Sequence, residues 1–299
     1  MTYDNLSRGH ESAVKWGPLE RGDIRDVARL AEVIERWNPQ VVLHFAALAY
    51  VAESVVDPAP YYDINVGGTQ VLLQAMVRAG IRNLVFSSSC TIYGVSQGVV
   101  HEGMSPNPIN PYGWTKAMAE QMIADHAAAH PLTAIRLRYF NAAGADPDGE
   151  IGENHDPEPH LIPRALMAAA GHLSHIDILG DDYPTSDGTC VRDYVHVSDL
   201  TQAHVAAANR LVNNGRALTC NLGTGRGYSV KEVLDEVERV TGRAVPRQVA
   251  ERRPGDPPIL VARADLARAE LQFEPRHSDM DSIISTAWAW HEAGRKIGA

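Results

Sequence analysis

Val41-Val-Leu-His-Phe-Ala-Ala47 is the stretch that decides the fold, because it is a short, continuous and largely β-branched apolar run. A run of this kind predicts a strand that is buried on both of its faces. On its C-terminal side, a helix, a strand, a helix and a strand are predicted in turn over 59–78, 84–88, 112–130 and 134–140. Gly80 and Pro131 provide the expected helix stops. This alternation predicts an α/β fold of Rossmann type, with a doubly wound parallel sheet and ligands at the strand C-termini.

The composition changes after Gly144. Residues 145–160 are acidic and rich in Pro and Gly, which predicts a long surface loop. Beyond it we expect helices over 161–170, 197–212, 230–241, 263–270 and 280–293, and strands over 176–179 and 218–222. We therefore expect a nucleotide-binding domain over 1–145 and a smaller α+β substrate lobe over 146–299, with some segments of the lobe returning to the first domain.

Composition excludes several classes of protein. The 299 residues are 44% hydrophobic and 21% charged, as in globular domains, and the net charge is −10. An acidic chain without basic runs is a poor ligand for phosphate backbones, so we expect no nucleic-acid partner. No apolar run approaches the roughly 18 residues of a membrane span, so we expect no membrane partner, and no signal peptide is evident. Three widely spaced cysteines, Cys90, Cys190 and Cys220, predict free thiols in a reducing cytoplasm.

The residues Tyr112-Gly-Trp-Thr-Lys116 carry the first chemical signal. Tyr and Lys at positions i and i+4 share one helix face, and a nearby ammonium lowers the pKa of a phenol toward the range of a general base. Alone, this spacing is more often an exposed aromatic beside a solvated lysine. Ser87-Ser-Ser89 ends a predicted buried strand, where an α/β fold places its active site, and Asn65 lies on the helix between two strands.

These spacings resemble the extended short-chain dehydrogenase/reductase superfamily. Within it, five blocks in order are similar to the UDP-glucose (UDP-galactose) 4-epimerase family. The blocks are Tyr3-Asp-Asn-Leu-Ser-Arg-Gly9, Ser87-Ser-Ser-Cys-Thr-Ile-Tyr-Gly94, Arg138-Tyr-Phe-Asn-Ala-Ala-Gly-Ala-Asp-Pro147, Asp187-Gly-Thr-Cys-Val-Arg-Asp-Tyr-Val-His196 and Arg252-Arg-Pro-Gly-Asp-Pro-Pro258.

The resemblance implies an enzyme that epimerises C4 of a UDP-hexose with NAD, through a 4-keto intermediate, in galactose metabolism. Its catalytic residues would be Ser89, Tyr112 and Lys116. The residues that would bind NAD are Asp4, Asn5, Asp23, Ile24, Phe45, Ala46, Ala47, Ala49, Asn65, Ser87, Tyr112, Lys116 and Phe140. Those that would bind the UDP-sugar are Ser89, Asn141, His160, Leu161, Arg192, Tyr194, Arg253 and Asp256. The resemblance also implies a homodimer formed by helices 59–78 and 112–130.

One expected part of a dinucleotide site has no match. A Rossmann half begins with a strand and a Gly-rich turn, and the acidic ribose ligand follows about 20 residues later. Because that ligand would be Asp4 here, we expect the chain to lack the first βα unit of its family. This leaves three alternatives open: an epimerase of UDP-hexose, one of UDP-N-acetylhexosamine or UDP-pentose, and a catalytically silent truncated homologue.

Three further local features concern the reaction class, the size of the sugar and metal binding. Sugar-nucleotide 4,6-dehydratases carry an Asp-Glu pair after the serine run, whereas Cys90, Thr91 and Ile92 stand there in this chain. Leu260 occupies a position that limits sugar size in the family, and its intermediate volume does not select among the sugars. His126 and His130 have the i, i+4 spacing of a helical zinc pair but lack a third ligand, so we expect no metal site.

Overall fold

A computed structural model describes residues 1–253 and 256–294. Pro254 and Gly255, which belong to the Arg252–Pro258 block, lie outside the described residues. The chain forms two compact units. The first comprises 1–92, 106–138 and 204–219, and the second comprises 93–105, 139–203 and 220–299.

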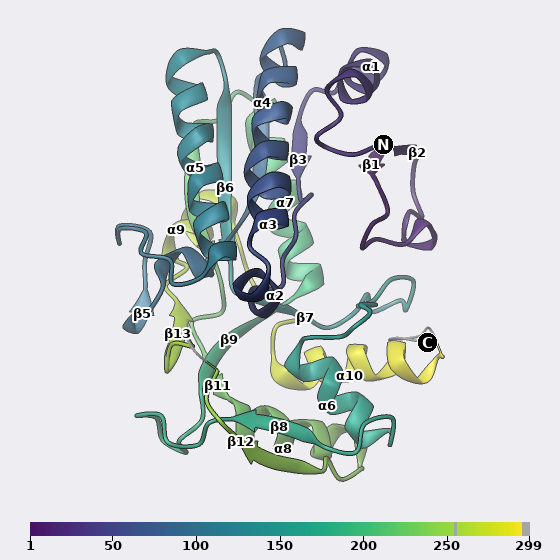
Figure 1. The fold of residues 1–299 in the computed structure, drawn as a ribbon, viewed down its shortest axis with the longest axis vertical. Helices are drawn as coiled ribbons and strands as arrows, with labels where there is room; N and C mark the ends of the chain where they lie inside the picture. Colours follow the sequence, from purple (N-terminus) through teal and green to yellow (C-terminus); the bar gives the residue numbers. More distant parts are fainter. Residues whose placement is uncertain (254–255, 295–299) are drawn as a thin grey trace. The chain divides into compact units, whose positions relative to one another are not determined.

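Short strands and longer helices alternate through the first unit (Figure 1). Its elements are β1 (Thr2–Asp4), η1 (Glu11–Ala13), β2 (Leu19–Arg21), α1 (Val27–Trp37), β3 (Val42–His44), α2 (Val51–Val56), α3 (Ala59–Tyr61), η2 (Tyr62–Gly67), α4 (Gly68–Ala79), β4 (Asn83–Ser89), α5 (Pro111–Ala129) and β6 (Thr133–Tyr139). Strand β3 pairs in parallel with β4, and the order β10-β6-β4-β3 makes one sheet. Strands β1 and β2 form a separate parallel pair in which Asp4 lies opposite Arg21.

Apolar side chains from α1, α4 and α5 form the core of this unit against β4. Leu73, Met76, Leu84, Phe86 and Ile123 are buried together there. Helices α4 and α5 lie side by side in Figure 1. Strand β4 is therefore covered along its length, and only its C-terminal end is left to present polar groups.

The helix expected over 59–78 is interrupted by a π-helical segment, η2. Its residue Asn65 is buried and turns its amide toward the loop after β3, while Thr69 Oγ1 donates to the Asn65 carbonyl at 2.5 Å. A Cβ on Gly68 would lie 2.4 Å from Ile24 Cγ2, so only glycine permits this close packing. The wide turn thus places a polar side chain at the edge of the sheet, as π-helical segments often do at functional sites.

The second unit combines a mixed sheet with a three-helix cluster. Its elements are η3 (Cys90–Tyr93, which enters it), β5 (Gln97–Val100), β7 (Asn141–Ala143), α6 (Leu161–Ala169), β8 (Ile176–Leu179), β9 (Val191–His196), α7 (Val197–Val212) and β10 (Leu218–Leu222), which pass between the units, β11 (Gly227–Ser229), α8 (Val230–Thr241), β12 (Arg247–Ala250), β13 (Ile259–Ala262), α9 (Asp265–Leu271) and α10 (Met280–Glu292). The sheet has the order β11-β9-β13-β5, with β7 beside β9. Helices α6, α8 and α10 share one core, which includes Leu166, Leu234 and Ile284.

The α/β fold class predicted from the sequence is confirmed. Helices α7 and α8 and strands β8 and β10 have the predicted limits, and the other predicted helices and strands occur within a few residues. Residues 145–160 contain no helix or strand, as expected. The prediction omitted helices α1 and α2. It also omitted strands of three to six residues, such as β1, β2, β9 and β11, and these strands are too short to show a clear hydrophobic period in the sequence.

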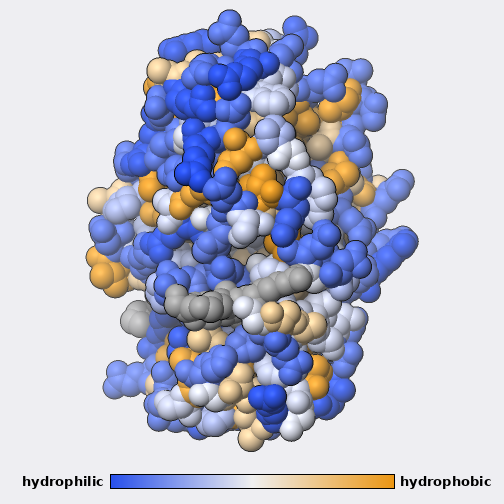
Figure 2. Space-filling view, turned by 90° about the vertical axis from the view of Figure 1, so that its right-hand side faces the viewer, coloured by the Kyte–Doolittle hydropathy of each residue, from blue (hydrophilic) through white to orange (hydrophobic). Residues whose placement is uncertain are grey.

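The surface in Figure 2 is mostly hydrophilic, with a group of apolar residues in its upper half. Among the described residues, none of the helices has both the length and the apolar character needed to cross a membrane.

Candidate active site

Tyr112 and Lys116 lie in the first two turns of α5, and both side chains are buried. Asn110 caps this helix by accepting a hydrogen bond from Gly113 N at 2.8 Å. The Lys116 ammonium donates to the Ser87 carbonyl at 2.8 Å and lies 5.9 Å from the centre of the Tyr112 ring. Burial lowers the pKa of Lys116 to about 8. The predicted lysine–tyrosine pair therefore exists, on one helix face and at the end of β4.

A buried ion pair fixes this part of α5 on the sheet. Glu120, one turn after Lys116, accepts from Ser88 Oγ at 2.5 Å and from two nitrogens of Arg138 at 2.9 and 2.6 Å. The side chains of Glu120 and Arg138 are 6% and 8% exposed, so water screens the pair little. The sequence analysis did not assign this role, although Glu120 repeats the i+4 spacing that pairs Tyr112 with Lys116.

Ser89 is the last residue of β4 and is 6% exposed. Its hydroxyl accepts from Thr91 N at 3.2 Å and from Thr91 Oγ1 at 3.0 Å, so it stays able to donate its own proton. Ser87, Ser89, Tyr112 and Lys116 all belong to the first unit, and the structure brings them to the C-terminal end of one strand and the start of one helix.

The candidate residues for the adenosine part of NAD follow β1 and β2. Asp4 ends β1, and its Oδ1 accepts from Leu6 N at 2.6 Å. Asp23, just beyond β2, accepts from Asn5 Nδ2 at 2.9 Å and from Arg25, and these bonds hold the pKa of its carboxyl well below the usual range. Because β1 and β2 are parallel, both carboxylates lie at the same edge, which suits ribose and adenine hydrogen bonding. Ile24 is buried against Gly68.

The candidate cofactor residues in the segment 45–49, which follows β3, are the most exposed. Phe45 is 54% exposed and its ring lies 4.8 Å from the ring of His204, while Ala46 and Ala49 are also exposed and Ala47 is half-buried. Asn65 fixes the segment, because its amide accepts from Leu48 N at 2.8 Å and donates to the Leu48 carbonyl at 2.9 Å. Its Nδ2 also reaches Thr115 Oγ1 at 2.9 Å. Asn65 therefore positions the backbone of this segment relative to α5.

In the second unit, three charged side chains predicted to bind the UDP-sugar meet. Asp256 accepts from Arg253 at 3.0 and 2.9 Å, and Arg192 Nη2 lies 3.4 Å from Asp256 Oδ1. Arg192 also donates to the Val191 carbonyl at 2.9 Å and to the Pro257 carbonyl at 2.8 Å. Two guanidinium groups share one carboxylate, which leaves one positive charge in excess. Such a cluster attracts an anion, and guanidinium pairs bidentately with phosphate.

The remaining predicted substrate residues also lie in the second unit. Asn141 of β7 is directly opposite Tyr194 of β9, whose burial raises its pKa to about 12. Leu260 of β13 lies opposite Arg192 and is 6% exposed. His160 is the residue before α6, and Leu161, its first residue, packs on the core. Phe140, which is predicted to bind NAD, is also in the second unit; it is buried and donates its N–H to the Leu222 carbonyl at 3.2 Å.

Two polar residues near Arg192 are held inside the second unit. Asp193 is fully buried and accepts from Thr224, Gly225 and Ala262 backbone N–H groups at 2.9, 3.0 and 3.1 Å. His196 Nδ1 accepts from Ser198 N at 3.1 Å, and its Nε2 lies 3.0 Å from Thr286 Oγ1. Their side chains hold neighbouring segments of the second unit in place, which is a structural role.

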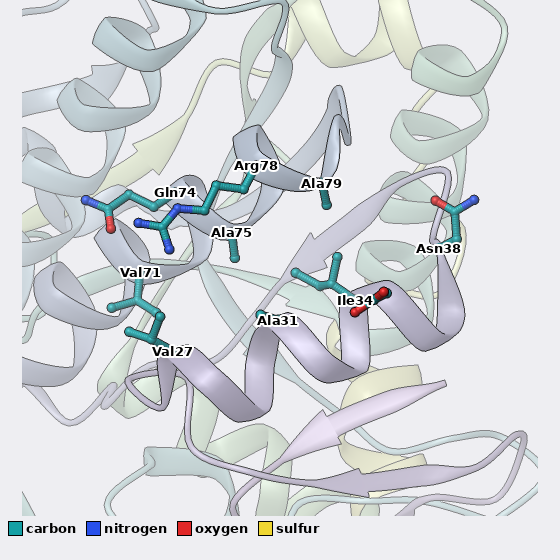
Figure 3. Close-up of a pocket in the computed structure, with 10 residues that line it drawn as sticks. Val27, Ala31, Ile34, Asn38, Val71, Gln74, Ala75, Arg78 and Ala79 are labelled. Carbon is teal, nitrogen blue, oxygen red and sulfur yellow. The ribbon is translucent and has the colours of Figure 1, made fainter.

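A cavity of about 390 Å³ lies between α1 and α4, away from these groups. Figure 3 shows Val27, Ala31 and Ile34 of α1 facing Val71 and Ala75 of α4 across it. Its lining includes the polar side chains of Glu35, Asn38, Gln74 and Arg78 but none of the candidate catalytic residues.

Comparison with known proteins gives a consistent match. Residues 2–223 match the model of the NAD dependent epimerase/dehydratase family. The chain is 52% identical over all 299 residues to the UDP-glucose 4-epimerase of Rhizobium meliloti, of which it covers 91%. The crystal structure of UDP-glucose 4-epimerase from Brucella ovis in complex with NAD is 56% identical, with 96% and 89% of the two chains covered and a TM-score of 0.93. That of Bifidobacterium longum UDP-glucose 4-epimerase in complex with NAD⁺ and UDP is 36% identical, with 99% and 91% covered and a TM-score of 0.93.

The lowered pKa of Lys116 predicts how stability depends on pH. Because the folded pKa is about 8 and the ordinary value is 10.5, the unfolded chain binds more protons between these values, and stability rises with pH across this window. In Lys116→Met this rise should disappear. Urea unfolding followed at several pH values between about 7 and 10 measures it.

Lys15→Met, at an exposed position, is the matched control and should keep the rise. An unchanged pH slope in Lys116→Met would contradict the assignment of the rise to this buried ammonium.

Proposed function

The chain belongs to the NAD-dependent epimerase/dehydratase family, and from this premise we propose that it interconverts UDP-glucose and UDP-galactose as a UDP-glucose 4-epimerase. The family resemblance drawn from the sequence is confirmed, and NAD is the cofactor. The observation that carries the proposal is the buried Tyr112–Lys116 pair beside Ser89 at the C-terminal end of β4. This set provides a proton acceptor at a strand end, where α/β folds bind their ligands.

The catalytic assignments form a simple proton path. Ser89 and Tyr112 bind the 4-hydroxyl of the hexose, and the phenolic oxygen of Tyr112 takes its proton. The Lys116 ammonium favours the phenolate by its charge and is held close by the Ser87 carbonyl. NAD, when bound, supplies the acceptor and donor of the C4 hydride. Tyr112 returns the proton after the 4-keto sugar has turned, so the reaction has no net redox change.

The first unit has the groups that an NAD molecule needs at its two ends. Asp4 and Asn5 would hold the adenosine ribose, and Asp23 and Ile24 would flank adenine. A Cβ on Gly9 would stand 3.4 Å from the Asp4 carboxylate, so the glycine leaves space beside the ribose ligand. Phe45, Ala46, Ala47 and Ala49 would line the pyrophosphate, placed by Asn65, and Ser87 and Lys116 would hold the nicotinamide end. Phe140, which the resemblance also assigns to NAD, belongs to the second unit.

The second unit would anchor the substrate through its diphosphate. Arg192 and Arg253 provide the excess positive charge, with Asp256 holding both guanidinium groups. Asn141, His160, Leu161 and Tyr194 would complete the UDP-sugar site. The alternative substrates, UDP-N-acetylhexosamine and UDP-pentose, depend on the volume beside Leu260, which lies opposite Arg192 in the sheet.

Removing the phenolic oxygen tests the base. Tyr112→Phe should lower the interconversion rate by at least about 100-fold, because proton transfer by a positioned base contributes that much. The assay follows UDP-galactose conversion with NAD added, and NAD released on denaturation is measured in parallel and should be unchanged. Tyr62→Phe, an exposed tyrosine on η2, is the control and should retain activity.

Full activity in Tyr112→Phe would remove Tyr112 from the base role. Absence of turnover in the wild-type chain with NAD added would contradict the proposed function itself.

Arg192→Ala tests the diphosphate anchor. Truncating one partner of a buried charge cluster costs on the order of 2 kcal/mol, so the Kd for UDP should rise about 30-fold in calorimetric titration. Arg239→Ala, an exposed arginine of α8, should bind UDP as the wild type does. Unchanged affinity in Arg192→Ala would exclude this residue from the site.

We propose further that the protein is a homodimer joined through α4 and α5. The support is an apolar stripe on α5, where Trp114 is 43% exposed and Met118, one turn later, is 41% exposed. Exposed apolar groups so close together favour burial against a second copy. We also propose a cytoplasmic location, which is supported by the three buried free thiols of Cys90, Cys190 and Cys220.

Met118→Glu tests this interface by placing a charge in the stripe. The variant should sediment as a monomer at concentrations where the wild type sediments as a dimer. Gln202→Glu is the control, because this polar side chain is exposed on α7, outside both helices of the proposed interface. A wild-type monomer, or a dimer that survives Met118→Glu, would contradict the interface.

A further inference from the structure

Two histidines and two glutamates converge in the long loop before α6. Glu153-Asn-His155-Asp-Pro-Glu158-Pro-His160 repeats a glutamate two residues before a histidine. Four ligand atoms, one from each of these residues, lie within 4.8 Å of one another. His155 Nδ1 is 3.1 Å from Glu153 Oε1 and 3.4 Å from Glu158 Oε2, and His160 Nδ1 is 2.5 Å from Glu153 Oε1 and 3.2 Å from Glu158 Oε1.

The Glu158 carboxylate is the most enclosed member of the cluster. Its side chain is 2% exposed, against 18% for Glu153. One oxygen accepts from His160 N at 2.8 Å, whereas within residues 1–253 and 256–294 Oε2 makes no well-aligned hydrogen bond and has the His155 ring nitrogen near it at 3.4 Å. A buried carboxylate oxygen with such poorly aligned pairing is costly, and a bound cation is one way to satisfy it.

We propose that Glu153, His155, Glu158 and His160 form a binding site for a divalent transition-metal ion of the Zn²⁺ class. Two carboxylates match the charge of a dication, and two imidazoles, which lose their protons when a metal binds, supply the nitrogen ligands that such an ion prefers. The proposal goes beyond the epimerase activity and departs from the expectation, drawn from the sequence, that the chain has no metal site.

The distances suit a small tetrahedral shell. With metal–ligand bonds of about 2.0–2.1 Å, ligand atoms stand roughly 3.4 Å apart. Three of the four nitrogen–oxygen separations, 3.1, 3.2 and 3.4 Å, are close to that value, with the two oxygens of Glu158 each facing one histidine, and the 2.5 Å pair must open. The two imidazoles select against Mg²⁺ and Ca²⁺, which prefer all-oxygen shells. His155 and His160 are 30% and 47% exposed, which gives an ion a path of entry.

The backbone around the cluster is held on several sides. Pro157 and Pro159 restrict the chain between the ligands, and His160 is fixed at the start of α6. Trp290 Nε1 of α10 donates to the Glu153 carbonyl at 3.0 Å. The ligands are thus partly preorganised without a metal, and an ion would fasten the 145–160 loop to two helices of the same unit.

Zinc titration of the full chain, freed of metal by a chelator, tests the site without NAD or UDP-sugar, so its result is independent of the proposed function. We expect one Zn²⁺ per chain and a visible d–d absorption spectrum when Co²⁺ replaces it. His155→Ala and Glu153→Gln should each weaken Zn²⁺ binding by at least about 100-fold and abolish that spectrum. His160 is left unchanged because it is also proposed to contact the substrate.

The matched control is the double variant His126→Ala, His130→Ala. It removes a different pair of neighbouring histidines, whose rings are 5.7 Å apart at the C-terminal end of α5. It should bind Zn²⁺ as the wild type does. No binding by the wild-type chain, binding that survives both His155→Ala and Glu153→Gln, or loss in the control would overturn the proposal. Circular dichroism confirms that each variant is folded, and the Co²⁺ spectrum reports ligand identity independently of stability.

Discussion

The burial of the Lys116 ammonium at the end of β4 is the constraint on which the active-site geometry depends. A buried charge must be paired or hydrogen-bonded, and here the Ser87 carbonyl and the ring of Phe86 face it. Glu120, one turn further, adds the negative charge and ties α5 to β4 and β6 through Ser88 and Arg138. The same contacts that make the buried ammonium tolerable therefore fix Tyr112, because Tyr112, Lys116 and Glu120 lie along one face of α5.

The sequence predicted what is encoded locally. Helix α8 begins at a capping box between Ser229 and Glu232 and ends at Gly242 in the left-handed conformation, so its limits are readable from neighbouring residues. The three-residue strands β1 and β2 have no such signal, because they exist through pairing with each other. Strand β9 carries Arg192 and Asp193, and the backbone N–H groups of Thr224 and Gly225 that donate to Asp193 make a buried carboxylate acceptable there.

The candidate site divides in the same way. The Tyr112–Lys116 pair was predictable because four residues of helix bring the two side chains together wherever the helix lies. The meeting of Arg192 with Asp256 joins segments 64 residues apart, and only the resemblance to a family suggested it. The cluster of Glu153, His155, Glu158 and His160 was not predicted, because its residues do not have the i, i+4 spacing of a helical metal-binding pair. An irregular loop with two prolines brings these four side chains together.

The residues proposed for proton transfer and those proposed to anchor the substrate belong to different units, and this separation bears on the specificity for the sugar. The groups proposed to move the proton lie on β4 and α5 of the first unit, where a buried network leaves little room for change. The groups that would hold the diphosphate lie on β9 and around Asp256 in the second unit, and Leu260 is paired directly with Arg192 there. If Leu260 limits the size of the sugar, as the family resemblance implies, we expect substitutions there to change sugar preference without disturbing the pKa of Lys116, because no residue of the Lys116–Glu120–Arg138 network belongs to that strand.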